Sequence, residues 1–380
     1  MAATNGAIVL GGHIQALGII RILGRLGIKS IIIDKTRNNI TRHSRFCSGF
    51  YKSKDSNLLS LLFKLGFEKK FNKWIIFPTN DFHVKLLSIN KGKLEEYFIV
   101  STDNWEVVRN FYNKCYTYEL VGKLKIPFPE TWFPKSEKDL TDISVSYPCL
   151  IKPAVMHDFY SKTKKKVLVC HSEQELYTQY RKAAKIVPSE EILIQEIIPG
   201  GSKNQVSACF LFLKGEKFIY LTASRMRQHP TDFGNATTYA ETIRVKEIID
   251  YAISILKAVN YNGLCEVEFK KDERDGLYKL LEVNPRTWKW HSIANKTDTP
   301  FIECFFNFLN GRSIDYTDGF KDASFLHRLT DFPVRLKLLL KGYPYWNKKA
   351  WPCEYAVWSK DDILPSVFEI VYLPYNLLTR

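Results

Sequence analysis

Apolar and polar residues alternate most regularly late in the chain, between Gly263 and Trp288. Residues 264–270 and 277–284 each alternate, and the charged residues 271–276 separate the two runs and end in a glycine. Two alternating runs joined by a polar turn predict a β-hairpin. Because residues two apart on a strand share a face, the polar side chains of each strand gather on one side of this hairpin.

The polar face of the predicted hairpin is strongly acidic. If Glu268 pairs across from Glu282, then Glu266 lies opposite Asn284, and three carboxylates crowd one face. Like charges that face each other on a sheet are destabilising, and a cation between them would remove that penalty. Oxygen ligands of this kind suit Mg²⁺ held against a nucleotide phosphate. A solvated acidic face is the alternative interpretation.

Periodicity near the N-terminus predicts a βαβ unit. A short apolar strand at 7–10 leads into a Gly-Gly-His turn, a helical pattern over 14–26 and a second strand over 29–33. This order is typical of a parallel sheet covered by helices. NAD binding is disfavoured, because His13 stands where the dinucleotide fingerprint needs its second glycine. A further strand at 74–77 precedes Asp81, which we interpret as a helix cap rather than a catalytic acid.

The middle of the chain alternates helical and strand patterns. A helix is expected from Lys114 to Leu124, and Pro127 and Pro129 shortly after it forbid its continuation. An apolar strand over 148–153 contains Lys152 near its end, where a solvated lysine is not expected. Further strands are expected over 191–198, 206–213 and 217–222, the last two joined by a turn at 214–216, and a helix over 247–259.

Composition limits the class of protein. With 380 residues, 45% of them hydrophobic and 25% charged, the chain can form two or three packed units. It has no apolar run of about 20 residues and no basic segment before an apolar core at its start, so we expect a cytoplasmic protein. The eight cysteines are scattered without a C-x-x-C pair and are expected to be reduced. The net charge of +15 is spread along the chain without a nucleic-acid-binding motif.

The hairpin carries a resemblance to a known family. Glu268, followed by Glu282-x-Asn284-Pro285-Arg286, resembles the metal-binding signature of the ATP-grasp superfamily. With Trp288, the string is similar to predicted ATP-dependent carboxylate–amine ligases, the group that includes D-aspartate ligase. The resemblance implies an α/β fold of the ATP-grasp type, with a Rossmann-like N-terminal domain before a two-subdomain ATP-grasp domain.

The resemblance also assigns roles to residues. Glu268, Glu282 and Asn284 would hold Mg²⁺ or Mn²⁺, and Arg286 would contact phosphate or the reacting carboxylate. Lys114 and Lys152 would contact the phosphates of ATP. The hinge, comprising Gln195, Glu196, Ile197 and Ile198, would bind adenine and ribose. Arg225 and Arg227 lie two residues apart, so we expect both on one face and at least one of them on the acid substrate.

The implied reaction is attack of a carboxylate on the γ-phosphate of ATP, followed by capture of the acyl phosphate by the amine of an amino acid or amino sugar. Alternatives are a ligase of another acceptor class, carbamoyl-phosphate-like or thiol, and a non-catalytic ATP-binding protein. The sequence departs from the family between Val155 and Val167, where a glycine-rich flap is replaced by a glycine-free stretch with four lysines.

We expect four segments: a Rossmann-like domain over 1–105, two ATP-grasp subdomains over 106–190 and 191–314, and a C-terminal extension over 315–380. The extension contains Trp346, Trp351 and Trp358 among tyrosines and lysines. Capping of the core is its plain interpretation, and contact with a membrane surface is an alternative. The expected partners are ATP and small substrates, and a homodimer is left open.

Overall fold

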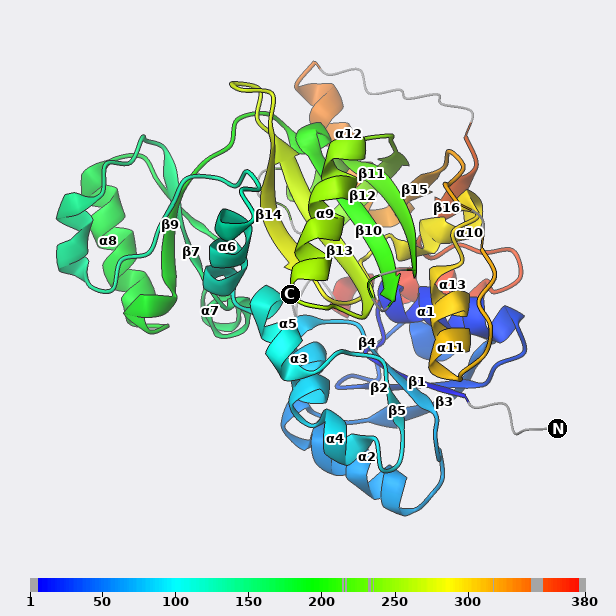
Figure 1. Ribbon diagram of the computed structural model, residues 1–380. Helices are drawn as coiled ribbons and strands as arrows, with labels where there is room; N and C mark the ends of the chain where they lie inside the picture. The colour runs from blue at the N-terminus through cyan, green and yellow to red at the C-terminus, as the bar shows by residue number, and fades with distance from the viewer. Residues whose placement is uncertain are drawn as a thin grey trace.

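A computed structural model of the protein describes residues 6–213, 215, 217–231, 234, 236–316, 318–342 and 351–375. Three sheets are built from consecutive stretches of the chain, and Figure 1 shows each as a separate layer with its own helices. The expected α/β class, with a parallel sheet first, is thereby confirmed. The limits placed at 105, 190 and 314 stay predictions. Lys214 and Glu216 of the expected turn, and Trp346, lie outside the described residues.

The first sheet is parallel, with five strands in the order β3-β2-β1-β4-β5. Its strands are β1 (Ala7–Leu10), β2 (Ser30–Asp34), β3 (Cys47–Lys52), β4 (Ile75–Pro78) and β5 (Ile99–Val100), and its helices are α1 (Ile14–Arg25), α2 (Leu58–Phe67), α3 (Asp81–Ile89) and α4 (Lys91–Leu94). Every residue of β1, β2 and β4 is buried, as expected of parallel strands covered on both faces.

The second sheet is antiparallel, with four strands in the order β6-β9-β7-β8, and forms the lobe at the left of Figure 1. Its strands are β6 (Thr131–Trp132), β7 (Cys149–Pro153), β8 (Leu168–Cys170) and β9 (Ile192–Glu196), and the helices of this region are α5 (Trp105–Tyr112), α6 (Lys114–Lys123), α7 (Met156–Thr163) and α8 (Glu173–Ala184). Asn113 begins α6, because its side chain accepts a hydrogen bond from the amide of Cys115 at 2.9 Å.

The third sheet has seven strands in the order β14-β13-β10-β11-β12-β15-β16. Its strands are β10 (Gln205–Leu213), β11 (Lys217–His229), β12 (Ala236–Thr242), β13 (Gly263–Lys271), β14 (Tyr278–Asn284), β15 (Ser324–Leu326) and β16 (Cys353–Tyr355), and the helices are α9 (Lys246–Ala258), α10 (Ala294–Thr297), α11 (Phe301–Leu309), α12 (Arg328–Leu340) and α13 (Leu364–Val371). Strands β15 and β16 come from the expected C-terminal extension and complete one edge of this sheet.

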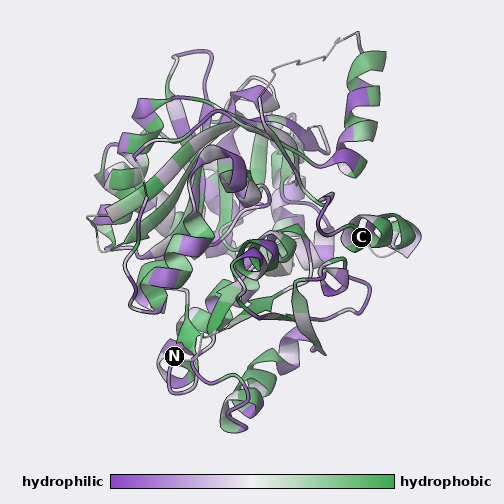
Figure 2. Cartoon of the chain, turned by 90° about the vertical axis from the view of Figure 1, so that its right-hand side faces the viewer, coloured by the Kyte–Doolittle hydropathy of each residue, from purple (hydrophilic) through white to green (hydrophobic). Residues whose placement is uncertain are grey.

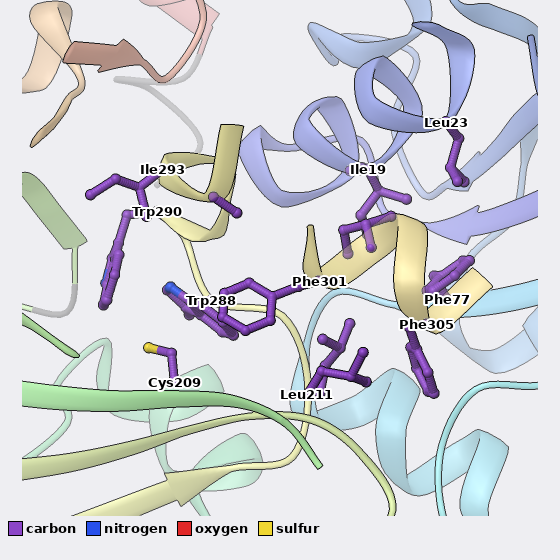
Figure 3. Close-up of a cluster of buried hydrophobic side chains, with 14 of the residues drawn as sticks. Ile19, Leu23, Phe77, Cys209, Leu211, Trp288, Trp290, Ile293, Phe301 and Phe305 are labelled. Atoms are coloured by element: carbon purple, nitrogen blue, oxygen red, sulfur yellow. The ribbon is translucent and has the colours of Figure 1, made fainter. Parts of the chain in front are cut away.

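One hydrophobic core joins the first sheet to the third (Figure 3). Trp288 and Phe301 lie between α1 on one side and the β10 residues Cys209 and Leu211 on the other. The ring of Trp288 packs edge-on against Phe301 with centroids 5.5 Å apart, and only 1% of the residue is exposed. This packing fixes the chain that immediately follows the acidic hairpin.

The end of the chain is tied to the first sheet by a buried ion pair. Arg21 of α1 contacts Asp362 at 2.8 Å, and the hydroxyl of Ser44 donates to the same carboxylate at 2.6 Å. The ring of His43 stacks on Phe368 of α13. The residues around β16 also join the shared core, so the interpretation of this segment as a cap is confirmed for its described part. No helix among the described residues is long and apolar enough to cross a membrane.

We predict that Asp362→Ala lowers the free energy of unfolding by about 3–5 kcal/mol, because the Arg21 guanidinium stays buried but loses its carboxylate partner and keeps only the backbone oxygen of residue 362. The neighbouring Asp361→Ala is the control, since Asp361 pairs with Arg25 at the surface, where ion pairs contribute about 0–1 kcal/mol. Urea denaturation of both variants measures the difference. Equal losses in the two variants would contradict the structural role of Asp362.

Candidate active site

The acidic hairpin has the register expected from the sequence. Glu268 pairs across from Glu282, and Glu266 pairs across from Asn284. The hydrogen-bond register shifts after Glu268, so the regular pairing ends beside the acids. Glu266 and Glu268 are buried, which argues against the interpretation of a solvated face.

The buried carboxylates have few partners for their charge. The amide of Asn284 donates to Glu266 at 3.3 Å and to Glu268 at 3.1 Å, and Ser207 donates to Glu266 at 3.1 Å. The guanidinium of Arg225 contacts Glu268 at 2.9 Å. Burial and the neighbouring Glu268 raise the pKa of Glu266 to about 8, against the opposing pull of nearby arginines. This face of the hairpin can therefore accept additional positive charge.

Lysines surround the second strand of the hairpin. Lys114, the first residue of α6, lies 3.4 Å from Glu282. Burial raises the pKa of Glu282, but the charges of Lys114, Lys166 and Lys152 lower it by more, so the net direction is well below the usual value. Lys166 belongs to the glycine-free stretch, most of which folds as α7. A side-chain charge from this stretch therefore acts on the site.

Lys152 is buried beneath the same region. Its ammonium donates to the hydroxyl of Tyr118 at 2.6 Å and to Gln195 at 2.8 Å. Burial, assisted by the charge of Lys114, lowers the pKa of Lys152 to about 7. Tyr118 also donates to the backbone oxygen of Leu281 at 2.8 Å, which links this lysine to β14. The expectation that Lys152 has no solvated role is confirmed by its burial.

Arg286 connects the hairpin to the first sheet. Its Nε donates to Asp81 at 2.6 Å, and its Nη2 donates to the side-chain oxygen of Asn284 at 3.1 Å. The interpretation of Asp81 as the helix cap is wrong, because Asn80 caps α3 by accepting from the amide of His83 at 2.8 Å. Asp81 instead stands at the carboxyl end of β4, the edge at which parallel sheets bind ligands. Its place shortly after an apolar strand was the feature of the sequence that could have indicated a role at the site.

Comparisons with known proteins agree with this geometry. A family model described as the ATP binding domain of the carbamoyl-phosphate synthase L chain matches residues 226–315. D-aspartate ligase of Enterococcus faecium is 24% identical over 265 residues, which cover 65% of this chain and 62% of that protein. The C-terminal section of the carbamoyl phosphate synthase large chain from Methanopyrus kandleri is 24% identical over 191 residues, or 48% of this chain and 33% of the relative. This chain thus spans less than two thirds of either relative's length.

A solved structure extends the likeness to the fold. The ADP complex of N5-carboxyaminoimidazole synthetase from Staphylococcus aureus superposes with a TM-score of 0.66 at 15% identity, covering 90% of this chain and 87% of that one. The chain is thus similar to ATP-grasp ligases, in sequence over part of its length and in fold over most of it. The three sheets follow the expected order, with the Rossmann-like sheet first.

Arg225 and Arg227, which were predicted to share a face, point to different partners in the structure. The pairing of β11 with β12 shifts register around Arg227, as at a β-bulge, which re-aims side chains. Arg225 lies on Glu268, whereas Arg227 makes a two-point contact with Asp331 of α12, at 2.8 and 2.9 Å. The expectation of a common face is therefore corrected, and only Arg225 joins the acidic hairpin. The substrate role of either arginine stays a prediction.

The predicted hinge, residues 195–198, lies at the end of β9 and contacts the turn of the acidic hairpin. The carboxylate of Glu196 contacts Arg274 at 2.5 Å and Lys279 at 3.3 Å, and accepts from the amide of Glu130 at 3.0 Å. Ile197 is half-buried and Ile198 is buried. An apolar strand end beside a backbone turn suits the face of an adenine ring. The contacts of these residues with a nucleotide stay predictions.

The metal ligands predicted from the ATP-grasp signature fit a hard cation. The set combines two carboxylates and an amide oxygen, and Mg²⁺ is commonly held by one or two carboxylates together with phosphate oxygens. Burial, and then the neighbouring Glu268, raise the pKa of the adjacent Glu266, and a cation at this face would oppose that rise. Among the described residues no group of three or more His, Cys, Asp or Glu side chains could hold a metal. The proposed ligand set is of a different kind, because it has only two acids, Glu268 and Glu282, and its third member is the amide Asn284.

We predict that Arg227→Met lowers the free energy of unfolding by about 3–5 kcal/mol, because Asp331 is then buried without its partner. The double variant Arg227→Met/Asp331→Leu should recover much of this loss, since no unpaired charge remains. Urea denaturation of the single and double variants measures the coupling. Additive losses would show that the two side chains do not act as a pair.

Proposed function

We propose that this chain is an ATP-dependent ligase that activates a carboxylate as an acyl phosphate and joins it to the amine of an amino acid or amino sugar. The observation that carries the proposal is the buried acidic face of β13 and β14, ringed by cations from separate parts of the chain. Such a face suits a reaction in which phosphate charge must be gathered and then stabilised.

Glu268, Glu282 and Asn284 would hold Mg²⁺, with Mn²⁺ as the alternative ion. When bound, the ion neutralises charge on the phosphates of ATP. Its ligands now contact cations of the protein itself, namely Arg225 and Lys114. Metal binding at the carboxylates would turn these cations toward the phosphates and the acid substrate, so the site exchanges one set of ion pairs for another.

The chain's own residues account for the other requirements. Lys114 and Lys152 would bind phosphate oxygens, and Lys166 would cover them from the glycine-free stretch, replacing backbone amides with a side-chain charge. Adenine would lie along Ile197 and Ile198. Tyr118 orients the Lys152 ammonium from below.

The reaction needs no nucleophilic side chain. A substrate carboxylate oxygen attacks the γ-phosphorus, and the bond to ADP breaks. The amine nitrogen then attacks the acyl carbon, inorganic phosphate leaves, and the nitrogen loses a proton. Arg286 and Arg225 would hold the negative charge of the acid and of the acyl phosphate, because guanidinium groups bind carboxylate and phosphate at two points.

The alternative acceptor class is the one used by carbamoyl phosphate synthase, and the extent of similarity favours the amine ligase. The alignment with D-aspartate ligase covers 65% of this chain, whereas that with the carbamoyl phosphate synthase section covers 48%. A thiol ligase and a non-catalytic ATP-binding protein are the other candidates.

ADP release by the full chain, screened over carboxylates with amino acids and amino sugars as acceptors, tests the proposal. We expect turnover only when Mg²⁺, a carboxylate and an amine are all present. ATP binding without turnover across the whole screen would favour a binding protein, and turnover with a thiol acceptor would change the class.

We predict that Glu282→Gln reduces Mg²⁺-dependent ADP formation by at least ~100-fold, because the site loses a charged ligand at the developing phosphate charge. The variant should remain folded, because glutamine keeps the shape of the side chain and Glu282 is only partly buried. Glu119→Gln is the control, because Glu119 is exposed on α6. Near-normal turnover in Glu282→Gln would remove it from the metal site.

We predict that ATP affinity falls as the pH rises above about 7, by up to about tenfold per pH unit. Lys152 is protonated below its pKa of about 7 and neutral above it, and phosphate binds the protonated form, so binding at higher pH must take up a proton. Lys152→Arg should remove this dependence, because arginine stays charged. Lys152→Ala should weaken binding by about 1.5–3 kcal/mol. Titration calorimetry of ATP binding across this pH range tests the prediction. If the affinity of wild type and of Lys152→Arg changed with pH in the same way, Lys152 would not be the phosphate-binding group that titrates.

A further inference from the structure

Helix α12 turns an apolar stripe outward. Phe332, Leu336, Leu339 and Leu340 are 71%, 48%, 54% and 80% exposed. Their spacing of four, seven and eight residues places them on one side of a helix. The opposite side is buried, with Asp331 held by Arg227 and Val334 packed inward. The helix is therefore anchored by a buried ion pair, and its most apolar side is largely exposed.

The polar positions around this stripe are basic. The exposed charged residues from 328 to 341 are Arg328, Arg335, Lys337 and Lys341, and the single acid of that stretch, Asp331, is buried. The guanidinium of Arg328 lies over the rings of Tyr355 and Trp358, at 4.0 and 5.6 Å from their centroids. Apolar side chains interleaved with cations and flanked by aromatic rings are typical of a helix that lies in a lipid interface.

Helix α13 presents a second stripe of the same kind. Leu364, Val367, Ile370 and Val371 are all at least 47% exposed and recur at helical spacing. Glu369 of α13 contacts His327, the residue that precedes α12, at 2.5 Å. Figure 2 shows both helices at the right-hand edge of the molecule, α13 beside the C label and α12 beside the grey trace. The two helices thus lie on the same side of the molecule in this view.

We propose that the exposed sides of α12 and α13 dock this protein onto an anionic lipid bilayer. Both helices are far too short to span it, so they would lie along its surface. The basic residues of α12 favour a bilayer over a second copy of the protein as the binding partner. A second copy related by a twofold axis would bring one basic helix against another, and like charges oppose such contacts. An anionic surface offers negative head groups for the cations and acyl chains for the stripe.

The experiment is sedimentation of the full chain with vesicles of phosphatidylglycerol and phosphatidylcholine, compared with vesicles of phosphatidylcholine alone. We expect binding to the anionic vesicles that weakens as salt is added. Leu336→Gln/Leu340→Gln should reduce the partition coefficient by about tenfold or more, because two leucines lose their burial in lipid. Lys337→Gln/Lys341→Gln should reduce it by about tenfold or more through lost attraction to head groups.

Phe67→Gln is the matched control, since Phe67 is 81% exposed at the end of α2 in the first-sheet region. It should bind vesicles like wild type. Because all substituted residues are exposed, circular dichroism and thermal midpoints should be unchanged in every variant. Equal binding to both vesicle types, or full binding by the α12 variants, would overturn the proposal. So would a dimer in light scattering that the leucine substitutions dissociate, because it would assign the stripe to a second copy.

Discussion

The crowding of carboxylates on one face of β13 and β14 is the constraint around which the rest of the structure is arranged. Two acids on one strand and a third across from them repel one another, and burial strengthens that repulsion. The chain offsets it with Arg225 from β11, Lys114 from the start of α6 and Arg286 from the loop after the hairpin. Arg225 and Arg286 belong to the region of the seven-stranded sheet and Lys114 to the helix before the second sheet, so the site needs both of these parts of the chain in place.

The shared core supplies that placement. Trp288 stands two residues after Arg286 and packs against α11, while β10 and α1 close the core around it. The first sheet and the seven-stranded sheet are thereby held together next to the acidic face. This arrangement brings Asp81, at the carboxyl end of β4, within reach of Arg286. The packing of Trp288 thus fixes the position of Arg286 relative to Asp81.

The sequence predicted the local features of the site well, because periodicity and turns are encoded nearby in the chain. The limits of β1 were predicted to the residue, and alternation predicted which acids share a face of the hairpin, while their pairing across the strands was an assumption that the structure bears out. What the sequence left undetermined depends on residues distant in the chain. The irregular pairing of β11 with β12 turns Arg227 away from Arg225, and its partner Asp331 lies 104 residues later. Tyr118, which holds Lys152, carried no signal other than the apolar side of α6.

The two arginines of β11 differ in how fully their charge is matched by neighbouring acids. Arg227 faces one carboxylate, contacts both of its oxygens and lies over the ring of Tyr239, so its charge is fully matched. Arg225 faces Glu268 beside a second acid, Glu266, whose pKa is raised first by burial and then by Glu268. A matched pair resists exchange, because either partner left alone in the interior is costly. An unmatched acid favours a further cation, so the charge distribution around Arg225 supports the proposal that this end of the strand binds ligands.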